Sequence, residues 1–420
     1  MKKHIIAASL LLSAATSFGA GYQINLQGLR QVAMGGTGTA WPWDASTIFY
    51  NPGGLARLKG IQAYASVLNI MPATAFGNQM NSGNTGTSVL SKERSFTPFN
   101  VYIGGPIQQD SKFAIGLGVY SSAGLGLSWD ENWIGKYIVQ TIDLKSINFQ
   151  PTLSYRISDF ISVGAGFVYS VGTFDFRKAL PVHGPLDPFQ GPTYDEGEAH
   201  LHGAANAVGF NAGIQMKVSD HFQVGLTYRS QLNMNVSSGT ATFTVPSTLN
   251  SSFPNTTFET ALPVPQVASV GIGYRAGDYL TLQADVNYNG WNSFDTLRID
   301  FAKTTNALHN VREPRKYKNT LTYRLGANYK VSKVVSLMAG GAYDPTPVVD
   351  GFVSPDLPDA DHIVLSCGIS IKPLRGFTIL AAVEGMTTPK RNGVYLNETN
   401  FNGVYKTEAI TPGIAVYYNF

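Results

Sequence analysis

The last eight residues of the chain read Gly413-Ile414-Ala415-Val416-Tyr417-Tyr418-Asn419-Phe420, and their character alternates. Ile414, Val416, Tyr418 and Phe420 fall on one face of an extended strand, while small or polar residues fall on the other. Successive side chains of a strand point to opposite faces, so this pattern suits a wall between lipid and water. The end of the chain therefore predicts one strand of a transmembrane β-barrel.

The same alternation recurs along the chain, for example at 147–155, 281–289 and 321–330. One face is apolar, while the other often carries Arg, Asp, Gln or Asn. A period of two residues indicates strands, and lipid outside with a wet lumen inside explains the difference between the faces.

Short and long connections alternate between these strands, as in outer-membrane barrels. Short turns are expected at 108–111, 158–159, 219–221, 276–278, 332–333 and 374–376. Long loops are expected at 72–97, 123–144, 181–199, 245–262, 302–315, 349–361 and 393–405. The chain is therefore predicted to be all-β, with a transmembrane antiparallel barrel of about 14 strands over residues 60–420.

The beginning of the chain indicates export. Lys2 and Lys3 precede a short apolar run at 5–15, and Ser17 and Gly19 suit a cleavage site. We interpret residues 1–19 as a signal peptide, because the run is too short to span ~30 Å of hydrocarbon. Export and a barrel together predict the outer membrane of a Gram-negative bacterium.

The composition limits which classes of molecule the chain is expected to bind. The net charge is only +3 in a chain with 14% charged residues, so nothing suggests nucleic acid. Cys367 is the only cysteine, which excludes an internal disulfide, and the alternation places it on the lipid face. We expect a monomer that contacts outer-membrane lipid and lipopolysaccharide. The terminal Phe420 resembles the signature read by the barrel-assembly machinery, which is the expected partner during biogenesis.

Residues 20–59 do not follow the strand pattern. They are rich in Gly, Ala, Asp and Ser, yet they also contain apolar residues such as Leu29, Trp41 and Ile48. A segment this apolar is not expected to extend into water, so it is predicted to fold back into the lumen as a plug.

Three stretches of this segment are similar to a known family. They read GYQIN at 21–25, MGGTGTA at 34–40 and DASTIFYNPGGLA at 44–56. They resemble the N-terminal hatch of the FadL/TodX family of outer-membrane transporters for long-chain fatty acids and other hydrophobic compounds. The resemblance implies a fourteen-stranded barrel closed by a hatch over residues 20–59, and it extends to 116–137, 148–155 and Phe420.

The resemblance assigns the hatch and gating residues to the end of this segment. They are Phe49, Tyr50, Asn51, Pro52 and Gly53. The family usually has Asn-Pro-Ala where this chain has Asn51-Pro52-Gly53. The lost methyl group is expected to loosen the backbone and make the plug easier to move. By themselves, these residues also fit a plain tight turn.

The sequence contains only weak matches to phosphate-binding, metal-binding and catalytic motifs. The glycines at 35–38 lack the lysine and the strand–helix setting of a phosphate loop. His200 and His202 fall on one face of a strand, but without a third ligand nearby we interpret them as solvated. The aspartates at 356, 359 and 361 lack the spacing of a calcium loop. With no nucleophile elbow either, we predict no catalytic residues, no metal site, no cofactor and no enzyme activity.

Two features suggest a path for a hydrophobic ligand. Two long loops carry apolar side chains that are candidates for capturing it: Leu186, Phe189, Leu249, Phe253 and Phe258. The same side chains could instead pack on one another over the barrel mouth. The stretch 121–127 interrupts the alternation as a bulge or kink does, which makes Ser121, Ser122, Gly124 and Gly126 candidates for a lateral opening. It could also be the start of a loop.

These observations and the resemblance predict passive import of long-chain fatty acids or similar hydrophobic small molecules. External loops would capture the ligand, the hatch would move, and the ligand would leave sideways through the wall, as the resemblance implies. The alternatives are a general porin for polar solutes and a surface receptor or adhesin that acts through its loops. The sequence leaves open whether the substrate is a fatty acid or an aromatic hydrocarbon.

Overall fold

The computed structural model describes residues 21–79, 85–182, 186–187, 191–192, 196–397 and 401–420. The predicted signal peptide at 1–19 and the loop residue Phe189 lie outside these residues. Within the described part of the chain, no helix combines the length and the apolar character needed to cross a bilayer.

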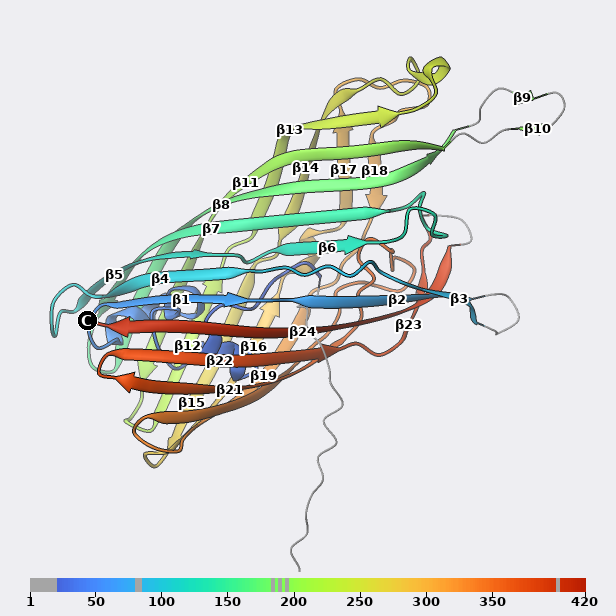
Figure 1. The fold of residues 1–420 in the computed structure, drawn as a ribbon. Helices are drawn as coiled ribbons and strands as arrows, with labels where there is room; N and C mark the ends of the chain where they lie inside the picture. Colours follow the sequence, from blue (N-terminus) through green and yellow to red (C-terminus); the bar gives the residue numbers. More distant parts are fainter. Residues whose placement is uncertain (1–20, 80–84, 183–185, 188–190, 193–195, 398–400) are drawn as a thin grey trace, which may run out of the picture.

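The described strands form one closed antiparallel barrel of 14 strands, as predicted (Figure 1). Several barrel strands are interrupted and therefore consist of two elements. In chain order the barrel strands are β1 and β2 (Gln62–Leu68, Met71–Gln79), β3 and β4 (Thr85–Leu90, Phe99–Pro106), β5 and β6 (Phe113–Tyr120, Gly124–Ser128), β7 (Thr141–Arg156), β8 (Ile161–Pro181), β11 (Glu196–Lys217), β12 and β13 (Phe222–Arg229, Leu232–Thr244), β14 and β15 (Thr256–Val264, Val267–Ala276), β16 and β17 (Leu280–Asn289, Thr296–Phe301), β18 and β19 (Val311–Pro314, Thr320–Lys330), β20 (Val335–Asp344), β21 (His362–Leu374), β22 and β23 (Phe377–Thr387, Arg391–Val394) and β24 (Asn402–Asn419).

The barrel closes between its first and last strands. β1 pairs with β24 from Gln62 opposite Asn419 to Leu68 opposite Gly413, and β2 continues this pairing along β24. The predicted faces of the last strand are confirmed, because Ile414 is 63% exposed and Ala415 is 3% exposed. The free thiol of Cys367 is also exposed on the outer surface, as expected.

The six predicted turns all connect neighbouring barrel strands, but the long connections are shorter than expected. Strands extend into several of them, such as β2 within 72–97 and β14 within 245–262. The sequence did not predict these extensions because the outer ends of the strands carry Gly, Pro and Thr rather than a clean alternation. Two small elements, β9 (Leu186–Asp187) and β10 (Gly191–Pro192), pair only with each other.

Residues 21–59, called the N-terminal segment below, lie inside the ring of strands (Figure 1, blue). The segment contains α1 (Leu29–Ala33), α2 (Thr47–Tyr50) and η1 (Pro52–Arg57). Leu29, Ile48 and Leu55 have no exposed surface, and they pack in one cluster with inward residues of the wall, including Tyr102. The apolar residues that set this stretch apart in the sequence therefore bury themselves in the bore.

Candidate functional site

The loop side of the bore contains an apolar cavity of about 330 Å³. Its lining comes mostly from inward positions on the outer halves of the strands, and it includes Tyr22, Leu125, Leu144, Phe174, Leu201, Phe253, Phe294 and Ile299. These positions are apolar here, whereas the inward positions around the N-terminal segment are largely polar. Cavities of this size and lining are typical binding sites for small hydrophobic ligands.

Tyr22 joins the N-terminal segment to the apolar cavity. Its ring is 4% exposed and packs edge-on against Trp291 and Phe294, with ring centroids 5.1 and 5.8 Å away. Its hydroxyl donates a hydrogen bond to the carbonyl of Pro263 at 2.6 Å. The sequence did not single out Tyr22, because its partners lie more than 240 residues away along the chain.

The polar end of the apolar cavity is built around a buried arginine. Arg315 donates to both carboxylate oxygens of Asp356, at 2.9 and 2.8 Å, and lies 2.8 Å from Glu313. Burial alone would raise the pKa of Asp356, but the guanidinium of Arg315 holds that pKa below its ordinary value. Two carboxylates surround one guanidinium, so this end offers no spare positive charge to an anionic ligand.

Two further basic side chains line the apolar cavity, Lys178 on β8 and His309 in the loop before β18. Lys178 is half-buried, and no carboxylate among the described residues pairs with it. An anionic head group placed in this cavity would therefore pair with Lys178 rather than with Arg315, whose charge is already balanced by two carboxylates.

The third barrel strand breaks at the predicted place. β5 ends at Tyr120 and β6 begins at Gly124, and the pairing of β5 with β4 stops at Asn100. At the break the strand bonds to the N-terminal segment instead. The backbone N–H of Ile24 donates to Ser122 at 2.9 Å, and that of Gly124 donates to Tyr22 at 3.0 Å.

A cavity of about 390 Å³ lies in the wall at this break and is called the wall cavity below. Ser121, Gly124 and Gly126 line it, and a Cβ on Gly126 would overlap the ring of Phe96. Ser122 instead bonds to the side chain of Asn148. Leu125 and Leu144 line both the wall cavity and the apolar cavity, which places the two cavities side by side.

Asn51 fastens the N-terminal segment to the wall. Its amide nitrogen donates to the carbonyls of Thr39 and Ile214, at 2.8 and 3.0 Å, and to the side chain of Gln215 at 3.2 Å. Its side-chain oxygen accepts the N–H of Gly53 at 3.1 Å and so caps η1, in which Pro52 is the first residue. One side chain thus connects the segment, its own turn and β11.

Phe49 and Tyr50 lie beside Asn51 and face different neighbours. The guanidinium of Arg229 stacks 3.6 Å from the ring centroid of Phe49 and donates to the Phe49 carbonyl at 2.6 Å. Tyr50 is half-buried, and its hydroxyl lacks a hydrogen-bond partner among the described residues.

Gly53 lies against the backbone of the barrel wall. A Cβ at this position would lie 2.8 Å from the carbonyl oxygen of Gly213 and 3.1 Å from that of Ser162. The missing methyl group lets η1 pack directly against the backbone of the wall. The effect of Gly53 on the movement of the plug stays a prediction.

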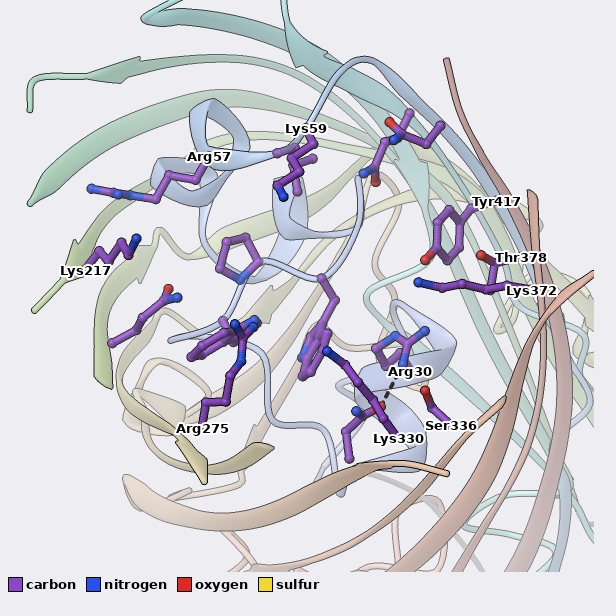
Figure 2. A pocket seen from close by; sticks show the side chains of 18 of the residues that line it. Arg30, Arg57, Lys59, Lys217, Arg275, Lys330, Ser336, Lys372, Thr378 and Tyr417 are labelled. Carbon is purple, nitrogen blue, oxygen red and sulfur yellow. Dashed lines mark hydrogen bonds between the residues drawn. The ribbon is translucent and has the colours of Figure 1, made fainter. Parts of the chain in front are cut away.

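The opposite side of the N-terminal segment faces a basic cavity of about 690 Å³ near the short turns (Figure 2). Eight cationic and two acidic residues line it: Arg30, Arg57, Lys59, Arg156, Lys217, Arg275, Lys330, Lys372, Asp159 and Asp220. Arg275 lies 4.4 Å from the ring of Trp41, and Arg30 lies 5.2 Å from that of Trp43. No local sequence pattern indicates this cluster, because its cations come from α1, η1, the residues after η1 and five different strands.

The predicted capture residues divide between the loops and the wall. Phe253 lines the apolar cavity, and Leu249 is half-buried in the same loop. Phe258 is not in a loop, because β14 begins at Thr256 and turns its ring inward, where it is 1% exposed. Leu186 lies in β9, whose side chains are not described. The role of these residues in capture stays a prediction.

The three loop aspartates are engaged within the protein. Asp356 pairs with Arg315, Asp359 lies 2.9 Å from His362, and Asp361 accepts the hydroxyl of Tyr343 at 2.6 Å. They point to separate partners rather than to one shared point.

Comparisons with known proteins agree with this architecture. The model of the family described as outer membrane protein transport protein (OMPP1/FadL/TodX) matches residues 10–420. A putative outer membrane protein of Neisseria meningitidis is 23% identical over 96% of this chain and 91% of its own length. The long-chain fatty acid transport protein of Salmonella typhi is 23% identical over 87% of each chain.

Two solved structures share the fold. A FadL homologue of Pseudomonas aeruginosa superposes with a TM-score of 0.79 at 20% identity, over 97% of this chain and 100% of that one. The toluene transporter TodX of P. putida superposes with a TM-score of 0.71 at 16% identity, over 97% of this chain and 99% of that one.

Proposed function

Because the chain belongs to the OMPP1/FadL/TodX family of outer-membrane transport proteins, we propose that it imports hydrophobic small molecules passively across the outer membrane. The relatives include proteins named for long-chain fatty acids and for toluene. The same substrate classes are proposed for this chain. The ligand enters from the loop side, moves from the apolar cavity into the wall cavity and leaves sideways into the membrane.

The adjacency of the two cavities carries this proposal. Leu125 and Leu144 line both, so a ligand in the apolar cavity needs to pass only these side chains to reach the break in the third barrel strand. Each buried CH₂ group of the ligand contributes about 0.8 kcal/mol on leaving water, which favours occupancy of the apolar cavity. The lateral opening at Ser121, Ser122, Gly124 and Gly126 is part of this proposal.

The N-terminal segment serves as the hatch. Ile24 and Tyr22 bond to the edge of the wall break, and Asn51 bonds to β11, three barrel strands further along the wall. Movement of residues 22–24 would break their backbone hydrogen bonds to the wall break, while the bonds of Asn51 hold the rest of the segment in place. Gating therefore begins at residues 22–24 rather than at the predicted Phe49 to Gly53, which we assign to anchoring.

No specific observation favours the porin or the adhesin, since a buried segment fills the bore and the apolar cavity lies inside the barrel. We expect no catalytic step in transport. A monomer, contact with lipopolysaccharide and insertion by the barrel-assembly machinery are further parts of the proposal.

Uptake of radiolabelled oleate and of toluene tests the lateral route, in cells that lack their own long-chain fatty acid transporter. Gly126→Leu fills the wall cavity, where a Cβ already meets Phe96. Gly77→Leu is the matched control, because the nearest atom to a Cβ there is 4.0 Å away. We expect uptake to fall at least about tenfold in Gly126→Leu, because the filled cavity blocks the exit, and to persist in Gly77→Leu. A tenfold fall corresponds to a barrier raised by ~1.4 kcal/mol. Equal uptake by both variants would overturn the lateral route.

A further inference from the structure

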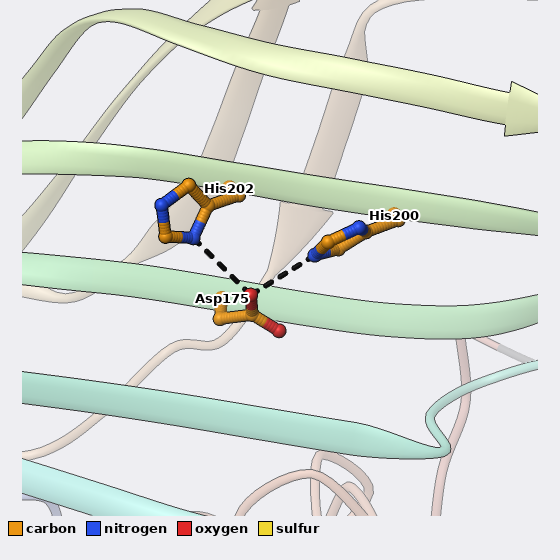
Figure 3. Close-up of side chains that lie close together, drawn as sticks. All are labelled: Asp175, His200 and His202. Carbon is orange, nitrogen blue, oxygen red and sulfur yellow. Dashed lines mark hydrogen bonds and ion pairs between the residues drawn. The ribbon is translucent and has the colours of Figure 1, made fainter.

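Two histidines and an aspartate converge on the outer surface of the barrel (Figure 3). Asp175 belongs to β8, and His200 and His202 belong to β11, where His202 stands opposite Asp175. His200 Nε2 lies 2.9 Å and His202 Nδ1 lies 3.2 Å from the same oxygen, Asp175 Oδ2. Side chains from two strands therefore point to one place.

The cluster faces away from the apolar cavity. Its strand neighbours Phe174 and Leu201 line the apolar cavity, so alternation turns Asp175, His200 and His202 outward. On β11, Val208 is 63% exposed and marks the apolar belt. His202 lies roughly 20 Å from Val208 along the strand, on the loop side, where water and lipid head groups reach it.

The spacing of the three groups suits a tetrahedral metal ion. Zinc binds imidazole nitrogen and carboxylate oxygen at ~2.0–2.2 Å, so neighbouring ligand atoms around it are about 3.3 Å apart. The two distances to Asp175 Oδ2 are within a few tenths of an ångström of that value, and all three ligand atoms lie within 4.8 Å of one another. Two imidazoles and one carboxylate, with a fourth position for water, are the ligands of open zinc sites.

The surrounding charges leave the site available. Arg177 Nε is 3.6 Å from Asp175 Oδ1, the other carboxylate oxygen, and so orients the carboxylate while Oδ2 stays directed at the histidines. Asp143 stands opposite Asp175 on β7 but pairs with Arg94 at 2.5 Å and with Lys145 at 3.3 Å. Asp143 is therefore neutralised by its own partners and is not counted as a ligand.

We propose that Asp175, His200 and His202 bind one divalent transition-metal ion of the zinc class on the outer face of the barrel. Nitrogen ligands favour zinc, copper(II) or nickel(II) over magnesium and calcium, which prefer oxygen ligands only. The proposal departs from the prediction of no metal site, because the sequence showed the histidine pair without Asp175. The bound ion would stabilise the pairing of β8 with β11, because it binds the folded state and not the unfolded chain.

Metal binding to the untagged, detergent-solubilised protein tests this proposal, with zinc followed by calorimetry and cobalt(II) by its visible spectrum. We expect one ion per chain and a tetrahedral cobalt spectrum. Asp175→Ala and His202→Ala should each weaken zinc binding at least about tenfold, the scale on which even supporting groups affect metal sites. His221→Ala is the matched control, because His221 is an exposed histidine in a short turn and its ring bonds to the backbone carbonyl of Arg275.

Folding is checked independently by the heat-dependent gel mobility of each variant, so that a loss of binding is not mistaken for a loss of structure. Oleate uptake by the zinc-free protein separates this proposal from the transport proposal, since the cluster lies outside both cavities. Zinc binding that survives both substitutions, or no stoichiometric binding by the folded wild-type chain, would show that the three groups form only a hydrogen-bonded cluster.

Discussion

The two cavities on either side of the N-terminal segment differ in chemistry. The apolar cavity on the loop side is lined mainly by Phe, Leu and Ile, while the basic cavity on the turn side has eight cations and two aspartates. Transfer of a hydrocarbon chain from water into the apolar cavity is favourable, because apolar surface is buried. Transfer into the basic cavity is unfavourable, because the chain would displace water from the cations. A straight route down the bore is therefore unfavourable for a hydrophobic ligand, whereas the wall cavity offers a short exit.

The largest expected effect comes from removing what separates the two cavities. Deletion of residues 21–57 from the mature chain should turn the barrel into an open channel, because the described residues of this segment fill the bore between the cavities. Ion conductance across planar bilayers should rise from near zero to a clear single-channel step. If the truncated barrel folds but does not conduct, the segment is not the barrier between the cavities.

A carboxylate placed in each cavity tests whether the two differ in ligand binding. Phe253→Asp puts a carboxylate into the apolar cavity, and Ser336→Asp puts the same group into the basic cavity. Burial of a phenylalanine side chain contributes ~1.5–3 kcal/mol, so we expect Phe253→Asp to weaken oleate binding about tenfold or more. Binding of a fluorescent fatty acid to purified protein measures this. Equal losses from both substitutions would mean that the two cavities do not differ in function.

A smaller effect distinguishes fatty acids from neutral hydrocarbons. Lys178→Gln should weaken binding of a fatty acid anion about two- to fivefold, since partly exposed ion pairs contribute ~1 kcal/mol or less. Toluene binding should not change, because toluene has no charge to pair. Lys330→Gln, in the basic cavity, is the matched control. A loss of toluene binding in Lys178→Gln would indicate that Lys178 shapes the cavity rather than pairing with a carboxylate.

The smallest expected effect is that of pH on ligand binding in the apolar cavity. The pKa of Asp356 in the folded protein is held below its unfolded value, so its ion pair with Arg315 stabilises the loop above about pH 4 and is lost as the pH falls through the lowered pKa. Ligand binding in the apolar cavity should therefore be flat from pH 8 to pH 5. A midpoint of binding near neutral pH would assign control of this cavity to another group.

The sequence predicted much of the fold, because alternation reports directly on which face meets lipid. Ile414 and Cys367 lie on the face that the pattern assigned to them. The break at 121–123 was also visible, since Ser121 and Gly124 interrupt the alternation where the pairing of β5 with β4 ends. Strand ends were poorly predicted because their outer parts carry turn residues, as the correction for Phe258 shows.

The contents of the cavities could not be predicted. Closure of the barrel brings together groups far apart in sequence, such as Tyr22 with Pro263 and Arg315 with Asp356. No local pattern reports on such pairs. The partner of His202 could not be predicted either, because Asp175 stands opposite it only in the register that the structure shows, whereas the loop was predicted at 181–199.

Photo-crosslinking with a diazirine-labelled fatty acid tests the route most directly, with adducts located by mass spectrometry on the wild-type barrel. The account predicts adducts on residues of the apolar cavity, such as Phe253, and on Leu125 and Ile24 at the wall cavity. Adducts confined to residues around the basic cavity, such as Lys330 and Lys372, would contradict it, because the ligand would then have travelled down the bore past the N-terminal segment.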